Sequence, residues 1–122
     1  MILADTSIWI DHLITEDRIL RELLDGEEII THPVVVGELA LGRWSRRRQV
    51  LNEIRLLPET CIARHDEVFH LIEDWALTGT GIGYSDAQLL ASVLLTSGTR
   101  LWTRDRPLLK VAQQLSLAAD LV

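Results

Sequence analysis

The sequence predicts an α/β protein, in which helices cover a central, mostly parallel sheet of four to five strands. Short apolar runs alternate with segments whose apolar residues recur at helical spacing, and this alternation is typical of a parallel α/β sheet. The 122 residues contain no internal repeat, low-complexity segment or linker. Residues 1–122 are therefore expected to form a single domain with one core.

The N-terminal part of the chain is predicted to contain two strands and three helices. Ile8, Trp9 and Leu13 are expected to face inward from the first helix, and Gly26 ends the second. Pro33 suits the first turn of the third helix, where its missing N–H costs no hydrogen bond. In order, the expected elements are a strand at 2–5, helices at 7–14 and 17–26, a strand at 27–33 and a helix at 33–42.

The rest of the chain continues the alternation of helices and strands. One helix carries an apolar stripe that includes Trp75, and the strongly apolar helix after it is expected to begin at Ser85 and end at Gly98. A glycine-rich connection at 79–83 separates these two helices. In order, the expected elements are a helix at 46–57, a short strand at 60–63, helices at 65–79 and 85–98, a strand at 99–103, a helix at 106–117 and a short strand at 118–122.

Composition narrows the class of protein. The hydrophobic fraction of 48% and the charged fraction of 25% are ordinary for a soluble globular domain. No apolar run approaches the ~20 residues that cross a membrane, and the N-terminus shows no basic leader, so no membrane association is expected. Cys61 is the single cysteine, which excludes an intramolecular disulfide and fits a cytoplasmic location.

Four carboxylates are expected to gather at one edge of the sheet. Asp5 follows the first strand, and Asp105 follows the strand at 99–103 in the same way. Asp86 stands at the head of an apolar helix, and Glu38 lies in the N-terminal half of another. In an open parallel sheet, ligands bind beyond the carboxyl ends of the strands, where helix N-termini also lie.

Two of these acids are spaced to lie on apolar helix faces. Glu38 is expected to share a face with Val34, Val35 and Leu41, and Asp86 heads the stripe that continues through Leu89. A carboxylate in such a place is costly unless it is paired or bound to a metal, and crowded anions raise the pKa of one another. A divalent cation removes both penalties, and Mg²⁺ or Mn²⁺ is the best match for carboxylate oxygens.

Each acid also has a simpler alternative role. Asp5, Asp86 and Asp105 are residue types that cap helices or favour the helix dipole in the first turn. Pro107, two positions after Asp105, strengthens the capping alternative there. Glu38 could instead pair with Arg43 across the helix surface. These alternatives stay open from the residues alone.

Arginines form two local groups, although the formal net charge of −6 argues against binding nucleic acid through overall charge. The planar guanidinium suits phosphate, and a solvated helix face is the alternative for the first group. The tryptophans are expected to serve core or interface packing rather than base stacking. The two groups are Arg43, Arg46, Arg47 and Arg48, and Arg100, Arg104 and Arg106.

Four stretches, taken in order and spacing, resemble a known family. These are "ADTSIWID", "VVVGELALG", "GIGYSDAQLLAS" and "LWTRDRPL". They are similar to the motifs of PIN-domain nucleases, specifically the VapC-type toxins of prokaryotic toxin–antitoxin pairs. The resemblance implies a three-layer α/β/α fold and a Mg²⁺-dependent endoribonuclease that hydrolyses RNA phosphodiester bonds, with Mn²⁺ as a substitute metal.

The resemblance also implies site residues. The family's acidic set falls on Asp5, Glu38, Asp86 and Asp105 of this chain, and these are the expected catalytic and metal-binding residues. Asp5, Asp86 and Glu38 are expected to hold one ion, while Asp105 binds a second ion or orients the attacking water. Hydroxyls that support the ligands are expected from Thr6, Ser7 and Thr103, and contacts with RNA from Arg43, Arg46, Arg104 and Arg106.

Partners follow from the same resemblance: an RNA substrate, a cognate antitoxin whose C-terminal segment covers the site, and a second copy in a homodimer. Many relatives carry another acid where this chain has Pro107, which puts the second metal position in doubt.

Two rival protein classes fit the sequence less well. A dehalogenase-type phosphatase needs an acid where Ser7 stands, and a phosphoreceiver domain needs an acidic pair after the first strand and a lysine after the last. A catalytically weak PIN domain that acts as a protein- or RNA-binding module is the remaining alternative.

Overall fold

The computed structural model describes residues 1–122 and contains one sheet of three parallel strands. The strand order is β2–β1–β3, so the N-terminal strand is central and pairs on both sides. Ile2 lies opposite Ile29 on one side and opposite Arg100 on the other. The strands are β1 (Ile2–Ala4), β2 (Ile29–Ile30) and β3 (Arg100–Trp102).

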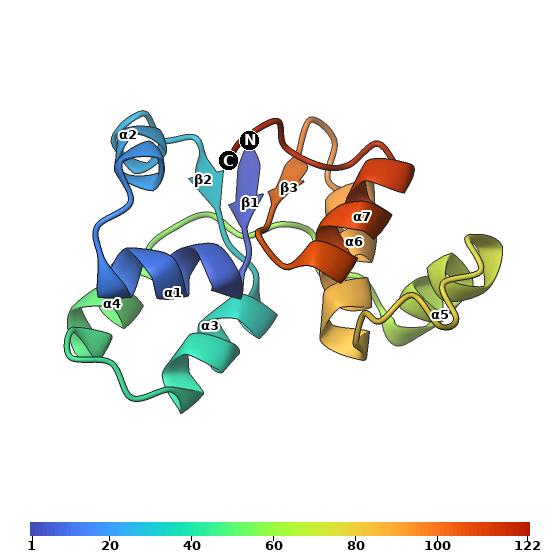
Figure 1. The fold of residues 1–122 in the computed structure, drawn as a ribbon, viewed down its shortest axis with the longest axis horizontal. Helices are drawn as coiled ribbons and strands as arrows, with labels where there is room; N and C mark the ends of the chain where they lie inside the picture. The colour runs from blue at the N-terminus through green and yellow to red at the C-terminus, as the bar shows by residue number, and fades with distance from the viewer.

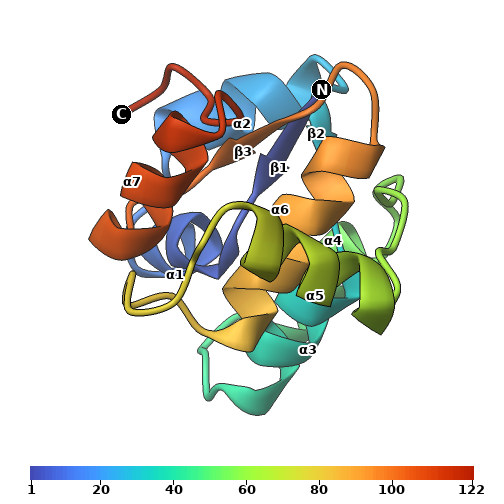
Figure 2. The same cartoon turned by 90° about the vertical axis from the view of Figure 1, so that its right-hand side faces the viewer.

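Helices cover both faces of this sheet. The helices α1 to α4 lie on one side and α5 to α7 on the other, which gives the expected three-layer α/β/α arrangement (Figures 1 and 2). Each helix is short, because turns and extended residues interrupt the chain often. The helices are α1 (Thr6–Ile14), α2 (Arg18–Asp25), α3 (Pro33–Leu41), α4 (Arg47–Ile54), α5 (His65–Asp74), α6 (Tyr84–Leu95) and α7 (Arg106–Gln114).

The sheet is smaller than the four to five strands that the sequence predicts. The segments 60–63 and 118–122 run beside the sheet but form no strand. One parallel bridge joins Thr31 to Glu59, and another joins Leu101 to Ala118. A single bridge does not continue as a ladder, so these segments extend the hydrogen bonding of the sheet edges without adding strands.

Several helix boundaries differ from the prediction, most clearly those of α5, α6 and α7. Helix α5 ends at Asp74 rather than at 79, because the chain turns at Ala76, whose φ is 48°. Trp75 is consequently 52% exposed and lies outside the core stripe. Helix α6 begins at Tyr84, with Gly83 rather than Ser85 as its N-cap, and it ends at Leu95 rather than at Gly98. Helix α7 stops at Gln114, shortly before Ser116 at a φ of 58°.

The core lies between the sheet and its two helix layers. β1 contributes Leu3 and Ala4, which are fully buried because helices cover both faces of the central strand. Trp9 and Trp102 are also buried, as expected for packing residues. None of the helices has the length and apolar content needed to span a membrane. The carboxyl ends of the strands meet at one edge, which faces downward in Figure 1.

Candidate active site

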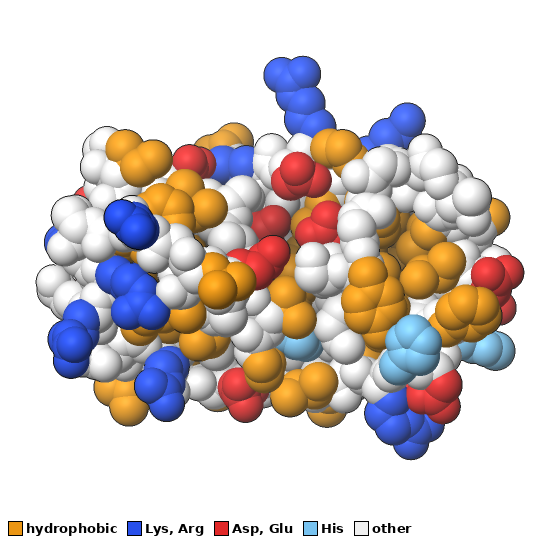
Figure 3. Space-filling model, turned by 90° about the horizontal axis from the view of Figure 1, so that it is seen from below, with side chains coloured by type: hydrophobic (Ala, Val, Ile, Leu, Met, Phe, Trp, Pro, Cys, Tyr) orange, Lys and Arg blue, Asp and Glu red, His pale blue; other side chains and the backbone are white.

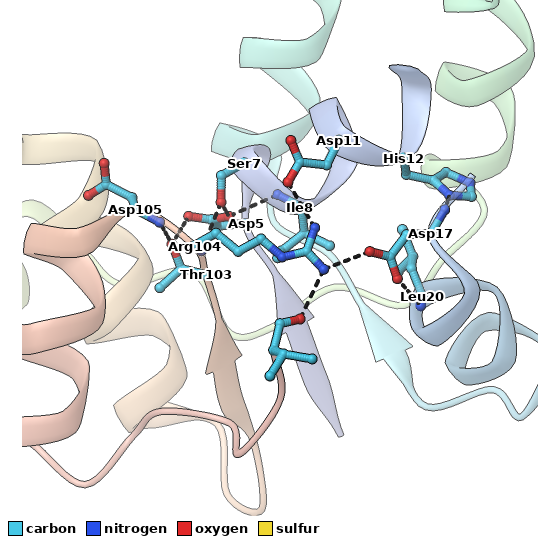
Figure 4. Close-up of polar contacts among 11 residues, drawn as sticks. Asp5, Ser7, Ile8, Asp11, His12, Asp17, Leu20, Thr103, Arg104 and Asp105 are labelled. Carbon is cyan, nitrogen blue, oxygen red and sulfur yellow. Dashed lines mark hydrogen bonds and ion pairs between the residues drawn. The ribbon is translucent and has the colours of Figure 1, made fainter. Parts of the chain in front are cut away.

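Asp5 is the first residue after β1, at the edge where the strands end. Its side chain is only 5% exposed and accepts three hydrogen bonds. Oδ1 accepts from the Ser7 hydroxyl at 2.5 Å and from the backbone N–H of Ile8 at 3.3 Å, while Oδ2 accepts from the Thr103 hydroxyl at 2.5 Å (Figure 4). Asp5 is therefore the N-cap of α1 and also the centre of a buried polar cluster.

The loop after β3 encloses Asp5 from the other side. The backbone N–H of Asp5 donates to the carbonyl of Trp102, which fixes the register of β1 and β3 where Thr103 begins the loop. The N–H of Arg104 donates to the Ser7 hydroxyl at 3.1 Å, and the N–H of Asp105 donates to the Thr103 hydroxyl at 3.1 Å. Each hydroxyl thus accepts from the backbone and donates to Asp5, so both are oriented toward the carboxylate.

Burial raises the pKa of Asp5 above its ordinary value, and the hydrogen bonds from Ser7 and Thr103 oppose this rise. The cause is the loss of water around a charged group, which favours the protonated form. The two hydroxyls favour the carboxylate form instead. They therefore reduce the rise in the pKa of Asp5 that burial causes.

Asp86 lies in the first turn of α6, half-buried, and accepts a hydrogen bond from the N–H of Gly83 at 3.4 Å. Burial is the main cause that raises the pKa of its carboxyl. The Gly83 N–H opposes that effect, and the negative charges of Asp105, Asp5 and Glu38 add to it. The charges of all three other predicted acids therefore act on the carboxyl of Asp86, which shows that the fold brings the four acids into one region.

Glu38 differs from the expectation of a carboxylate on a buried apolar face. Its side chain is exposed on α3, and Leu41, which was expected to share its face, is 89% exposed. Glu38 does not pair with Arg43; its Oε1 accepts a hydrogen bond from the Thr6 hydroxyl at 2.6 Å. The hydroxyl on α1 thereby holds the carboxylate on α3 at the same edge of the sheet.

Asp105 is the N-cap of α7, and its Oδ2 accepts from the N–H of Leu108 at 3.1 Å. Its side chain is exposed. The capping role raised for Asp5 and Asp105 is thus present in the structure. It does not compete with a second role, because a carboxylate has more lone pairs than a cap uses.

The predicted arginines fall into two different environments. The guanidinium of Arg104 is held by Asp11 at 2.8 Å, by Asp17 at 2.6 Å and by the carbonyl of Val122 at 2.9 Å, and it lies 5.4 Å from the ring centre of Trp102. It is therefore occupied rather than free for a ligand. Nothing in the sequence linked Arg104 to Asp11 and Asp17, since these residues are far apart along the chain.

The arginines around the start of α4 have no carboxylate partner. Arg47 donates twice to the carbonyl of Ala40, and Arg46 reaches the carbonyl of His12 at 3.4 Å. Arg43, Arg48 and Arg106 are exposed. In Figure 3, Lys and Arg side chains gather at one end of the face where the strands end, and Asp and Glu side chains gather near its middle. The basic group and the acidic site therefore share a face.

The four acids suit a hard divalent cation by their chemistry, although no three acidic, histidine or cysteine side chains converge into a preassembled metal site. None of the four forms an ion pair with an arginine or lysine, so their mutual repulsion is uncompensated within the chain. Carboxylate oxygens are the ligands that Mg²⁺ and Mn²⁺ prefer. Three of the histidines are engaged elsewhere: His12 and His32 are buried in hydrogen bonds, and Nδ1 of His65 lies 2.8 Å from the Tyr84 hydroxyl.

Comparisons with known proteins point to one family. The PIN domain family matches residues 2–114. The chain is also similar to a protein named Ribonuclease VapC32 from Mycobacterium tuberculosis, in strain CDC 1551 / Oshkosh and in strain ATCC 25618 / H37Rv. In both cases the identity is 48% over 108 residues, which is 88% of this chain and 87% of the relative.

Proposed function

The chain belongs to the PIN-domain family, in its VapC-type ribonuclease branch, and on that premise we propose that it is the toxin of a type II toxin–antitoxin pair. Its proposed reaction is the endonucleolytic hydrolysis of phosphodiester bonds in RNA. One observation supports this proposal most directly: the pKa of Asp86 is raised by burial and by the charges of Asp105, Asp5 and Glu38. Acids without a basic partner at the carboxyl edge of a parallel sheet are what a site for a cation and a phosphate is expected to contain, which supports the proposal.

We propose that Asp5, Glu38 and Asp86 hold Mg²⁺, with Mn²⁺ as a substitute, and that Asp105 stands at the edge of this site. When bound, such a cation supplies charge neutralisation at the scissile phosphate and a more acidic water. The absence of an acid at Pro107 leaves Asp105 with few neighbouring ligands for a second ion.

The chain's own residues prepare this site before any ligand arrives. The hydroxyls of Ser7 and Thr103 keep Asp5 oriented and favour its charged form, because both donate to the carboxylate. Thr6 turns Glu38 toward the same edge of the sheet. Oδ2 of Asp105 accepts the hydrogen bond that caps α7, so Oδ1 is available to orient a water in the reaction.

The RNA strand is proposed to cross the basic group at the start of α4. Arg43 and Arg46 have no carboxylate partner there, and an unpaired guanidinium can bind phosphate bidentately. Arg106 is exposed at the first position of α7 and is a further candidate for such a contact. Arg104 is left out of the proposed RNA contacts, because Asp11 and Asp17 already occupy its guanidinium.

The proposed partner is a small antitoxin whose inhibitory tail carries basic residues. An arginine that enters the acidic site would pair with the uncompensated carboxylates and exclude a metal or a phosphate. We also propose a homodimer and a cytoplasmic location, where an RNA substrate is available. Mixing the chain with the product of the neighbouring gene should suppress cleavage, and full activity in an isolated complex would exclude this form of inhibition.

Cleavage mapping on total RNA tests the main proposal. Purified protein is incubated with RNA in EDTA, in Mg²⁺ and in Mn²⁺, and the new 5′ and 3′ ends are sequenced. Cleavage at defined sites is expected with either metal and not with EDTA. Asp86→Asn should lower the cleavage rate about 100-fold or more. Loss of a residue that only supports a metal ligand already costs about 10–100-fold, and Asp86 is proposed as a ligand itself. Asp74→Asn, an exposed acid outside the site, is the matched control and should cleave normally.

One observation favours a second candidate, a catalytically weak PIN domain that binds RNA or protein. Both oxygens of Asp5 are already engaged by hydroxyls, and no preassembled metal site is present. The same assay separates the two functions. RNA binding without metal-dependent cleavage would support the binding module, and cleavage that Asp86→Asn abolishes would exclude it.

A further inference from the structure

Arg104 joins parts of the chain that lie outside the acidic cluster. Its side chain bonds to Asp11 on α1, to Asp17 at the N-cap of α2 and to the carbonyl of Val122. Burial acts to raise the pKa of Asp17, but the N–H of Leu20 and the Arg104 guanidinium outweigh it and hold that pKa below its ordinary value. The contact with Asp17 therefore stabilises the charged pair.

The backbone of Arg104 belongs to the cluster around Asp5. Its N–H donates to the Ser7 hydroxyl, which in turn donates to Asp5. The N–H of the next residue, Asp105, donates to the hydroxyl of the preceding residue, Thr103. Figure 4 shows the guanidinium extending away from Asp5 while the backbone stays beside it.

These two groups of contacts meet on the same helix. Ser7 and Asp11 are four residues apart on α1, so they lie on one face of the helix, one turn from each other. Arg104 binds the first through its backbone N–H and the second through its guanidinium. A residue that contacts a helix at two points one turn apart fixes both the distance and the rotation of its own loop relative to that helix.

We propose that Arg104 is a positioning residue for the active site: its ion pairs with Asp11 and Asp17 hold the loop 103–105 against α1 so that Thr103 and Ser7 orient Asp5. This inference rests on the proposed function, because it gives Asp5 a metal to bind. It replaces the RNA contact that the sequence predicts for Arg104. A catalytic constellation must be held within about 0.5 Å of its productive geometry, so a loosened loop affects the site before it affects the fold.

Arg21 provides a matched control. It also bridges two acids, Glu16 at 3.3 Å and Glu53 at 3.2 Å, and its side chain is 37% exposed against 30% for Arg104. Its contacts do not reach the loop 103–105. Arg21→Gln therefore removes two ion pairs without touching Asp5. Its urea unfolding midpoint should fall no further than that of Arg104→Gln, which also loses the contacts with Val122 and Trp102.

The first measurement is hydrogen exchange of the Asp105 amide in metal-free protein, because this amide donates to the Thr103 hydroxyl. Exchange at least 10-fold faster is expected in Arg104→Gln, with the wild-type rate in Arg21→Gln and an intermediate rate in Arg104→Lys. An unchanged rate in a folded Arg104→Gln would overturn the proposal whether or not the chain binds metal. If Arg104→Gln does not fold, Arg104→Lys against Arg21→Lys makes the same comparison.

The second measurement is Mn²⁺ affinity by titration calorimetry without RNA. Loss of a supporting contact typically weakens metal binding about 10–100-fold, and we expect the lower part of this range for Arg104→Gln and no change for Arg21→Gln. RNA affinity in EDTA should be equal in all three proteins. Weaker RNA binding with unchanged Mn²⁺ affinity would make Arg104 a substrate contact and overturn the proposal. A wild-type chain that binds no Mn²⁺ would count against the proposed function, while the exchange result would still decide the role of Arg104.

Discussion

The Thr103 hydroxyl donates a 2.5 Å hydrogen bond to Oδ2 of Asp5 and joins residues that are 98 positions apart in the chain. Ser7 provides the corresponding contact to Oδ1 from the neighbouring helix turn. The two hydroxyls come from opposite ends of the sequence and are brought together because β1 and β3 are neighbours in the sheet. The carboxylate that the proposed chemistry needs is thus held by the pairing of these two strands.

Replacing Thr103 with valine should weaken Mn²⁺ binding about 10–100-fold, because the Asp5 carboxylate loses a donor that orients it and favours its charge. Valine keeps the branched shape of threonine at this buried position, so the fold should persist. Thr103→Ser keeps the donor and should retain most of the affinity. Titration calorimetry with Mn²⁺ measures both variants. Equal Mn²⁺ affinities in Thr103→Val and the wild type would show that Thr103 does not support the proposed metal site.

The metal-free protein should gain stability from Asp86→Asn at neutral pH and not at pH 4. The folded-state pKa of Asp86 is raised, so its protonated form contributes stability that is present below the unfolded value of 3.8 and is lost as pH rises through the folded pKa. Asparagine removes the charge but can still accept the Gly83 N–H. Urea unfolding in EDTA at pH 4 and pH 7 makes the comparison.

Adding Mn²⁺ should then reverse the order of stability at pH 7. A ligand that binds only the folded state raises the melting temperature, and the wild type has the full set of acids for it. Asp86→Asn should show a much smaller rise. Equal shifts in both proteins at millimolar Mn²⁺ would contradict a metal site that includes Asp86.

Asp105→Asn should lower the rate of RNA cleavage clearly, but less than Asp5→Asn or Asp86→Asn. Asparagine caps helices about as well as aspartate, so the bond from Leu108 and the stability of α7 should be kept. Asp105→Ala should lose about 1 kcal/mol of unfolding free energy as well, since the cap is removed. Cleavage rates and urea unfolding of both variants separate the two roles. Normal cleavage by Asp105→Asn, together with a destabilised Asp105→Ala, would show a cap and nothing more.

The contribution of His32 to the free energy of unfolding should be lost as pH drops below 6.5. Its Nδ1 accepts from the N–H of Val34 and its Nε2 contacts the Ser92 hydroxyl at 3.0 Å, so the buried ring is neutral. Burial lowers the pKa of His32, and the same cause lowers that of His12. The unfolded chain therefore takes up protons first as pH falls, and folding stability present above 6.5 is lost.

His32→Asn tests the contribution of this residue. Asparagine keeps an N-cap acceptor for α3 but does not titrate. The loss of unfolding free energy between pH 7.5 and pH 5 should be smaller in the variant than in the wild type, with His12 providing the remainder. An identical pH dependence in both proteins would show that His32 does not titrate differently in the folded and unfolded states.

The helices were predictable because their apolar periodicity and end signals are local. The order of elements and the packing of Trp9 follow from such patterns. The two missing strands were not predictable, because an apolar run beside a sheet edge has the same sequence whether it makes one bridge or a ladder. The end of α5 depends on the positive φ of Ala76, and alanine is not a residue type that indicates such a turn in a sequence.

The positions of Asp5, Asp86 and Asp105 near one another follow from the parallel topology, so the sequence predicted their gathering. The exposure of Glu38 was not predicted, because helical spacing gives the face of a residue but not whether a neighbouring element covers that face. The partners of Arg104 were equally hidden. Ion pairs across long separations leave no periodic pattern in a sequence, and only the fold reveals which charges meet.

The central place of β1 has a consequence for the order of folding. The first strand made during synthesis forms the middle of the sheet, and its β3 neighbour is almost the last element to be made. Domains fold as the chain grows, but contacts between its two ends must wait for the later segment. A nascent chain that stops before Arg100 already contains Asp5, Glu38 and Asp86, yet it lacks both β3 and the Thr103 hydroxyl that bring Asp5 into position. A growing chain of this topology therefore lacks the assembled hydrogen bonds around Asp5 until its synthesis is nearly complete.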